Sequence, residues 1–365
     1  MLKVHIRPHW EIRFGAEPAL DTAALLGLLL AIQDTGSIAQ AAKAVHLSYR
    51  YAWGLLREAE RLFGQGLLET GRGRGTMLTP LAQKLVWADR RIAARLSPTL
   101  ESLASELENE LGKVNQETLR TIRMDASHGF AVAALTAYLN TMELPMELRY
   151  RNSTDAVAAL ARRECDLAGF HVPRGAHEAA TATWYLRWLG EAHSLVHIAG
   201  REQGLFVARG NPLGICGLAD LARPELRFVN RQAGSGTRML LEMMLAEAGI
   251  TPDAINGYNS AEFTHSAVAA YIASGMGDVG IGVRTAAERF KLDFIPLVWE
   301  RYFFALRTDA LDEPLMRQLL TVVRQPGYHR QVAALPGYDA SETGKIESVH
   351  EAFGRRREQP LGNEF

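Results

Sequence analysis

The stretch TGSIAQAAKAVHLSYRYAW, residues 35–53, decides the fold of the N-terminal part of the chain. Ser37 opens an S-x-x-Q capping box behind a glycine stop, which predicts that a helix begins there. The body of this helix is rich in alanine and lets a neighbouring helix approach closely. After a turn of about four residues, Ser48 can cap another helix that extends to about Phe63. Two helices joined by so short a turn are typical of a helix-turn-helix unit.

The segments on either side predict a winged form of this unit. Upstream, residues 25–32 repeat leucine and isoleucine at intervals of three and four, which predicts a helix with one apolar face, capped by Asp21. Downstream, Leu67–Glu69 and Met77–Thr79 predict short strands, and TGRGRGT, residues 70–76, lies between them. Glycines around two arginines predict a hairpin tip that reaches a minor groove or phosphates.

Charge supports a nucleic-acid partner for this segment alone. The whole chain of 365 residues has 40 Lys and Arg against 41 Asp and Glu, whereas residues 43–95 hold ten basic residues and four acidic ones. Such a local surplus is typical of a DNA-binding module, although a helical bundle with a solvated basic face remains the alternative. In a helix-turn-helix, the first turns of the second helix enter the major groove. The candidate DNA-binding residues are Ser37, Ser48, Tyr49, Arg50, Tyr51, Arg57, Arg72 and Arg74.

The following segment predicts a linker helix that makes a dimer. From Pro80 to about Lys113 leucines recur at spacings close to an a/d seam, and Ser97-Pro98 predicts a kink or a new helix. A helix packed on its own chain is the alternative. We favour a homodimer, possibly a tetramer, because two wings on a palindromic site require a two-fold axis. The predicted domains so far are residues 1–79 and a linker over 80–115.

The remainder predicts an α/β domain with parallel strands over residues 116–353, followed by a tail over 354–365. Short strand-like runs alternate with helical segments along this part of the chain. The predicted strands are Leu119–Met124, Leu144–Tyr150, Asp166–Phe170, Leu205–Ala208, Leu226–Asn230, Val279–Val283 and Asp293–Val298; the predicted helices are Gly129–Leu139, Asp155–Arg163 and three that begin at Arg238, His265 and Glu313.

Three junctions in this domain predict a small-anion site. In each, a strand ends and small polar residues open a helix, which places N–H groups and a hydroxyl at a helix N-terminus. In open α/β sheets, ligands bind at the carboxyl ends of the strands. The glycines of the third junction let a ligand approach the backbone, and an arginine adds charge. The candidates are Ser127 and His128, then Ser153 and Thr154, then Gly234, Ser235, Gly236, Thr237 and Arg238.

The N-terminal segment resembles the winged helix of ModE-type molybdate regulators, which is close kin to the LysR-type domain. The resemblance covers residues 20 to 90 and is carried by residues 35–43, by Leu47-Ser48-Tyr49-Arg50 with Ala52-Trp53, and by the Gly-Arg-Gly wing. It implies a bacterial regulator in which Ser48, Tyr49 and Arg50 contact bases or phosphates, with Arg72 and Arg74 on the wing.

The C-terminal part resembles a type 2 periplasmic-binding-protein domain of the molybdate and tungstate kind, recruited as a sensor. Ser127, Ser153 and the 234–237 loop carry the resemblance, which also takes in His265 and Tyr302. It implies two lobes, with lobe one over 116–208 and 299–353 and lobe two over 211–298. ModE itself carries a different, smaller molybdate domain, so the resemblance leaves the identity of the ligand open.

Other chemistry is poorly supported by the sequence. His193 and His197 have no carboxylate or cysteine at ligand spacing, so we expect no metal site. No nucleophile elbow or complete triad is present, so we expect no catalytic residues and no cofactor. Two cysteines give no disulfide framework, and the apolar run at residues 23–32 is too short to cross a bilayer, so the expected compartment is the cytoplasm.

These observations predict a fold and a function. The fold is α/β, with an N-terminal winged helix-turn-helix, a linker helix and a two-lobed domain like the type 2 periplasmic binding proteins. The predicted function is a one-component transcription regulator whose partners are double-stranded promoter DNA, a small anionic effector and a second copy of itself. Molybdate or tungstate is the first choice of effector, with formate, phosphate, sulfate or a molybdenum-cofactor-related ligand open. The alternative is an enzyme or carrier that binds a phosphorylated metabolite or oxyanion and has no DNA role.

Overall fold

The computed structural model describes residues 3–15, 19–71, 75–114 and 121–354. The chain forms two compact units, one of residues 7–96 and one of residues 97–365 together with the N-terminal residues 1–6. The polypeptide therefore passes between the units twice. Arg72 and Arg74, which we expect at the wing tip, lie outside the described residues.

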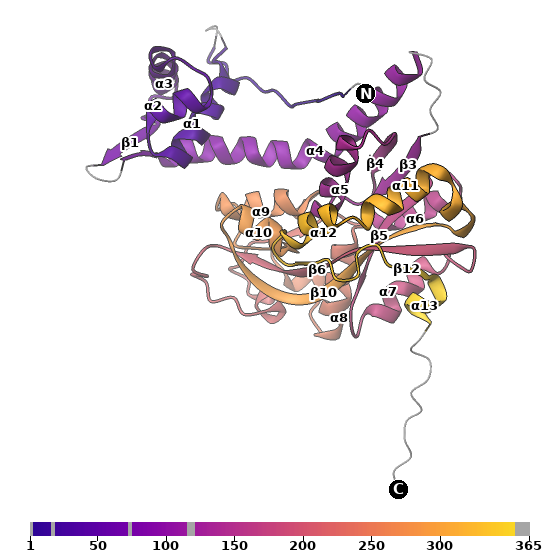
Figure 1. The fold of residues 1–365 in the computed structure, drawn as a ribbon. Helices are drawn as coiled ribbons and strands as arrows, with labels where there is room; N and C mark the ends of the chain where they lie inside the picture. Colours follow the sequence, from indigo (N-terminus) through magenta and orange to yellow (C-terminus); the bar gives the residue numbers. More distant parts are fainter. Residues whose placement is uncertain (1–2, 16–18, 72–74, 115–120, 355–365) are drawn as a thin grey trace. The chain divides into compact units, whose positions relative to one another are not determined.

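The first unit is a winged helix-turn-helix, as predicted (Figure 1). Three helices precede a two-stranded antiparallel hairpin in which Leu68 lies opposite Leu78. The predicted caps form: the side chains of Ser37 and Ser48 accept hydrogen bonds from the backbone of Gln40 and Tyr51. The elements are α1 Thr22–Thr35, α2 Ile38–Ala44, α3 Tyr49–Phe63, β1 Leu68–Gly71 and β2 Gly75–Leu78.

One apolar core holds these elements together. The predicted stripe of α1, from Leu25 to Ile32, is buried, and the small residues Ala41, Ala42 and Ala52 let the three helices pack closely. The hairpin closes the core with Leu67 and Leu78. Because the apolar face of α3 is used here, its opposite face is left to solvent.

Helix α4, Pro80–Val114, continues through Pro98 without interruption. A new helix beginning at Ser97, one of the two predicted alternatives, is therefore wrong. Val86 is buried in the core of the first unit, whereas Leu96, Leu103, Leu107 and Leu111 are among the exposed large apolar residues. In the second unit this helix thus presents Leu103, Leu107 and Leu111 to solvent.

The second unit is built on a ten-stranded sheet in the order β4-β3-β5-β10-β6-β9-β7-β8, with β11 and β12 paired to β6. The prediction of parallel strands holds for β3, β4 and β5 and for β7, β8 and β9. The long strands β6 and β10 are antiparallel to their neighbours and to each other. The strands are β3 Ile122–Ala126, β4 Met146–Tyr150, β5 Leu167–Pro173, β6 His193–Val207, β7 Phe228–Arg231, β8 Ala261–Glu262, β9 Val279–Val283, β10 Asp293–Arg307, β11 Tyr338–Asp339 and β12 Ile346–Ser348.

Helices cover both faces of this sheet (Figure 1). Successive residues of β10 point to opposite faces of the sheet. Phe304 packs in the core formed with α5, α11 and α12, and Phe303 packs in the core formed with α6, α7 and α13. The helices are α5 Phe130–Thr141, α6 Ser153–Ala161, α7 Glu178–Tyr185, α8 Gly236–Glu247, α9 His265–Ala273, α10 Arg284–Arg289, α11 Pro314–Val323, α12 Pro326–Ala333 and α13 Val349–Phe353, with short 3-10 turns at Leu218–Ala222, Pro252–Ala254 and Thr308–Asp312.

The strands β6 and β10 join two lobes. Toward one end of the sheet β10 pairs with β5, and toward the other end β6 pairs with β9. Both strands are longer than the sequence predicts, β6 beginning at His193 and β10 ending at Arg307. Their charged residues broke the apolar pattern, but Arg201 and Glu300 are buried as an ion pair between the two strands. The two-lobed α/β prediction is confirmed.

Candidate functional site

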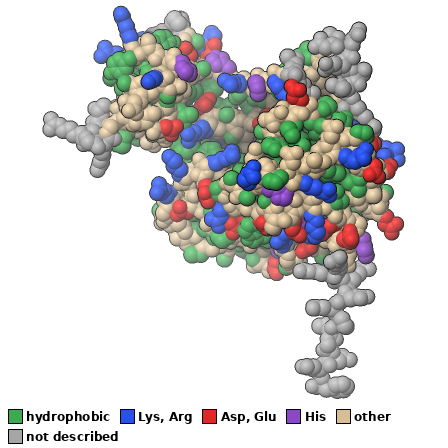
Figure 2. Space-filling model, viewed as in Figure 1, with side chains coloured by type: hydrophobic (Ala, Val, Ile, Leu, Met, Phe, Trp, Pro, Cys, Tyr) green, Lys and Arg blue, Asp and Glu red, His purple; other side chains and the backbone are tan. Residues whose placement is uncertain are grey.

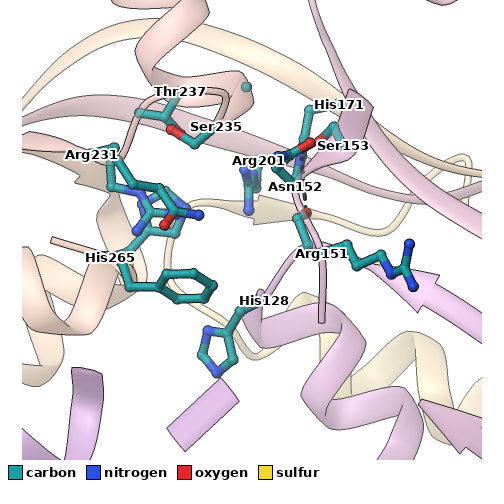
Figure 3. A pocket seen from close by; sticks show the side chains of 14 residues that line it. His128, Arg151, Asn152, Ser153, His171, Arg201, Arg231, Ser235, Thr237 and His265 are labelled. Atoms are coloured by element: carbon teal, nitrogen blue, oxygen red, sulfur yellow. Dashed lines mark hydrogen bonds between the residues drawn. The ribbon is translucent and has the colours of Figure 1, made fainter. Parts of the chain in front are cut away.

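A small cavity lies between the lobes, at the carboxyl ends of several strands (Figure 3). Its volume is ≈ 20 Å³, above the roughly 10–15 Å³ that a single water requires, so a guest that enters the cavity as it stands is small. The lining residues are Ser127, His128, Arg151, Asn152, Ser153, His171, Arg201, Arg231, Gln232, Ser235, Gly236, Thr237, Phe263 and His265.

Four helices begin at this cavity. The helices α5, α6, α8 and α9 start directly after Gly129, Asn152, Ser235 and Thr264. Three of these residues cap their helix with a side chain, as when the amide oxygen of Asn152 accepts from the backbone of Asp155 at 2.8 Å. Each helix N-terminus carries partial positive charge and unpaired N–H groups. Their convergence favours a negatively charged guest.

Two buried arginines face the cavity in different states. Arg201, on β6, is paired with Glu300, which also accepts from the side-chain amide of Gln203 at 3.0 Å. Arg231 ends β7 and is 6% exposed, and its Nε atom has no hydrogen-bond partner among the described residues. Burial, and then the positive charge of Arg201, lowers the pKa of Arg231 to about 9, so it is still a cation at neutral pH. Arg231 therefore has a donor left over for an anion; among the described lining residues, the Nδ1 atom of His265 is also without a partner.

Three histidines of the lining are neutral at pH 7. Burial is the main reason that the pKa of His128 is lowered to about 4 and that the pKa values of His171 and His265 lie well below the usual range. The Nδ1 atom of His171 lies 3.2 Å from the Ser153 hydroxyl and 3.4 Å from that of Ser127. Below it the ring of Tyr302 lies at 4.4 Å between centroids. His171 therefore connects two hydroxyls that come from different helix N-termini.

We expect the free energy of unfolding to fall as the pH drops from 7 toward 4. In the unfolded chain these histidines take up a proton near pH 6.5, whereas the folded state resists it, so the unfolded state binds more protons. Each histidine removes about 1.4 kcal/mol per pH unit in that window. Urea unfolding at pH 7, 6 and 5 measures this slope, and His171→Asn should flatten it by about one histidine's share. If the slope is unchanged in that variant, the lowered pKa of His171 is contradicted.

The structure brings together most of the ligand residues that the sequence predicts. Seven of them line the cavity, namely Ser127, His128, Ser153, Ser235, Gly236, Thr237 and His265. Four do not. Thr154 contacts Met239, Gly234 forms the turn before α8 with φ 78°, and Tyr302 lies beneath His171. The guanidinium of Arg238 pairs with Glu242 at 3.0 Å and lies over the Tyr258 ring, 4.6 Å from its centroid.

Seven lining residues were not predicted: Arg151, Asn152, His171, Arg201, Arg231, Gln232 and Phe263. Arg151, Asn152 and Gln232 stand in two of the three predicted junctions, residues 151–154 and 232–238, and Asn152 is recognisable there as a helix cap. In Figure 3 the Arg151 side chain points away from the other labelled residues, and its Nε lies 3.1 Å from a carboxylate oxygen of Asp125. Arg231 directly follows a predicted strand, which was the available signal. His171 and Arg201 lie inside strands and carry no such signal.

Five candidate DNA-binding residues belong to α3 or to its cap, namely Ser48, Tyr49, Arg50, Tyr51 and Arg57. Tyr49 and Tyr51 are 54% and 46% exposed, and Arg50 and Arg57 are also exposed. The hydroxyl of Tyr51 donates to Asp21 at 2.9 Å, which ties this turn to the cap of α1. Ser37 and Ser48 use their hydroxyls as helix caps. Arg50 is therefore an exposed cation in the first turn of α3.

The second unit has no surplus of positive charge. On the face that Figure 2 shows, acidic and basic side chains are interspersed over it. Among the residues that the structure describes, no cluster of three potential metal ligands occurs. The described helices also include none that is both long and apolar enough to cross a bilayer.

Comparison with known families covers both units. Residues 137–324 match the PBP superfamily domain, and this match takes in more than half of the chain. The chain belongs to the PBP superfamily. In this PBP-superfamily chain, residues 24–83 also match the bacterial regulatory helix-turn-helix protein, lysR family.

Several proteins are similar over part of their length. YvgK of Bacillus subtilis, an uncharacterized protein, is 32% identical over 205 residues, which are 56% of this chain and 66% of YvgK. The HTH-type transcriptional regulator CbbR of Xanthobacter flavus is 30% identical over 245 residues, 66% of this chain and 64% of CbbR. The molybdenum-pterin-binding protein MopB of Rhodobacter capsulatus is 29% identical over 157 residues, 41% of this chain and 56% of MopB. This chain thus spans about two thirds or less of these relatives.

Among solved structures, a cysteine-to-serine mutant of Corynebacterium glutamicum OxyR with bound H2O2 is 14% identical, covering 85% of this chain and 93% of that one, with a TM-score of 0.43. The two family matches are to a regulatory DNA-binding domain and a PBP domain, and CbbR is a regulator. Both family matches agree with the predicted fold, a helix-turn-helix unit followed by a PBP-like domain.

Proposed function

We propose that this chain is a one-component bacterial transcriptional regulator of the LysR type, acting in the cytoplasm, whose binding to promoter DNA responds to a small oxyanion. One observation carries the ligand part of the proposal: the buried guanidinium of Arg231 has an unpartnered N–H at a cavity where four helix N-termini meet. The DNA part is supported by the exposed arginines of α3 and by the match to a regulatory helix-turn-helix.

The chemistry of the lining favours a tetrahedral dianion. The described lining residues offer hydroxyls, amides and guanidinium groups as donors, and none of them is a carboxylate. A fully ionised oxyanion needs donors on all sides and no acceptor. Molybdate or tungstate is our first choice, and the similarity to MopB agrees with it. The other candidate ligands, to be compared with these two, are sulfate, phosphate, formate and a molybdenum-cofactor-related ligand.

Binding must favour one state of the regulator to change its DNA affinity. The lining comes from both lobes, so an anion between them stabilises the closed arrangement. The exposed leucines of α4 provide an apolar surface for a second copy of the chain, which makes a homodimer, or a tetramer, the expected form on DNA. The two DNA-binding units of such a dimer would then respond together to the anion.

A thermal-shift screen across oxyanions tests the ligand part. A ligand that binds only the folded state at 100 times its Kd adds about 2.7 kcal/mol of stability. We expect molybdate or tungstate to raise the melting temperature more than chloride at matched ionic strength. If no anion does so at millimolar excess, the ligand proposal is wrong. Gel shifts on the DNA upstream of the protein's own gene distinguish a regulator from an anion carrier, which would bind the anion and not the DNA.

A further inference from the structure

The outer edge of the large sheet is closed by the linker helix. Strand β4 is the edge strand, and β3 is its neighbour on the inner side. The backbone N–H of Arg151 points inward and donates to Ala126 at 2.9 Å. Since successive N–H groups of a strand alternate in direction, those of Leu148 and Tyr150 point outward, away from β3. An uncovered sheet edge leaves such groups to solvent.

Two serines of α4 receive these outward N–H groups. Ser105 Oγ accepts from the backbone of Leu148, and Ser102 Oγ accepts from that of Tyr150, each at 2.9 Å. The hydroxyl of Ser102 is itself oriented, because it donates to the Pro98 carbonyl at 2.9 Å. Serines three residues apart on a helix share one face, which matches the two-residue repeat of the strand edge. The helix thus replaces a missing neighbour strand.

This strand leads directly into the cavity. Tyr150 is its last residue, and the ring of Tyr150 lies edge-on to that of the lining residue His128, 5.0 Å between centroids. Glu101 of α4 also acts on Tyr150: after burial, its charge and hydrogen bond raise the pKa of that phenol. The next residues are Arg151, Asn152 and Ser153, all of which line the cavity. Whatever fixes the end of β4 therefore fixes one wall of the site.

We propose that Ser102 and Ser105 are positioning residues of the effector site, through which the docking of α4 on β4 and the binding of the anion are linked. The proposal rests on the proposed function of the cavity. Neither serine touches the guest. When the two serines hold β4, residues 151–153 are ordered before the anion arrives. The free energy of anion binding is then not reduced by the cost of ordering this segment. Linkage is reciprocal, so the anion in turn strengthens the docking of the helix that continues into the DNA-binding unit.

The test uses the full chain with both serines replaced, Ser102→Ala with Ser105→Ala. Alanine is the better helix former, so a loss is not due to weakening of α4 itself. Thr136→Ala is the matched control, since its hydroxyl donates to the Val132 carbonyl of its own helix at 2.9 Å. Two quantities are measured: amide hydrogen exchange of residues 146–150, and the Kd for molybdate, or for whichever of tungstate, sulfate and phosphate stabilises the wild type most.

In the double variant we expect exchange at Leu148 and Tyr150 to be about five-fold faster and the anion Kd to rise about five-fold. In the wild type, the anion should slow exchange at the same two amides. The control should match the wild type in both quantities. Unchanged exchange in the double variant overturns the docking, and faster exchange with an unchanged Kd overturns the linkage. If no anion binds the wild type, the proposed function fails and the linkage fails with it, while the exchange rates still report whether the serines hold the strand.

Discussion

Replacing Arg231 with glutamine is expected to weaken oxyanion binding by about 100-fold, because a hydrogen bond from a buried charged group is lost. Glutamine keeps an amide donor but removes the positive charge. The wild-type guanidinium is buried, carries an unpartnered Nε, and retains its charge at neutral pH although its pKa is lowered to about 9. Isothermal titration with the best anion from the thermal-shift screen measures the change.

Arg238→Gln is the matched control for this prediction. The sequence places Arg238 in the same glycine-rich junction, but its guanidinium pairs with Glu242 and lies over Tyr258, and it does not line the cavity. We expect its Kd to stay within about three-fold of the wild type, because the charge of Arg238 is already paired with Glu242 outside the cavity. Equal losses in the two variants would show that the effect is general electrostatics, and wild-type affinity in Arg231→Gln would remove that residue from the site.

Replacing Arg50 with alanine is expected to lower the affinity for promoter DNA by about 10- to 100-fold, the usual cost of losing one guanidinium contact to a base. Arg50 is exposed in the first turn of α3, between two tyrosines that are also exposed. If the contact is instead to a phosphate, the slope of log Kd against log salt should become shallower by about one. Gel shifts at several stated salt concentrations measure both quantities.

Arg61→Ala is the control on the same helix, because Arg61 lies in the last turn of α3 and is exposed. We expect a change of less than about three-fold there, since long-range charge effects are screened at physiological salt. If the two variants lose affinity equally, α3 contributes only general positive charge. An Arg50→Ala variant that binds like the wild type would place the DNA surface elsewhere on the chain.

The helical unit could be predicted almost element by element because its signals are local. Ser37 and Ser48 cap the predicted helices, and the leucines of α1 form the predicted buried face. Five short strands of the second unit, β3, β4, β5, β7 and β9, were also recognisable as apolar runs, whereas β8, β11 and β12 were not predicted. Of the long strands β6 and β10 only Leu205–Ala208 and Asp293–Val298 were predicted, because Arg201 and Glu300 interrupt the apolar pattern and become compatible with burial only by pairing across the two strands.

The candidate site could be predicted where it is built from helix starts, and not where it is built from strand interiors. Ser127, Ser153 and Thr237 stand at strand-to-helix junctions, whose geometry follows from the local sequence. His171 and Arg201 reach the cavity only because β5 and β6 are brought to it by the sheet order. Arg238 was the reverse case: its position in the sequence suggested an anion ligand, but Glu242, one helical turn away, pairs with it.

The most direct test of the account is the affinity of the full chain for the DNA upstream of its own gene, with and without the oxyanion that stabilises it, at matched ionic strength. We expect the anion to change the DNA Kd of the wild type by at least about five-fold, the lower end of ordinary allosteric coupling, and to leave that of the Arg231→Gln variant unchanged. An anion that binds at the cavity and leaves the DNA Kd of the wild type unaltered would contradict it.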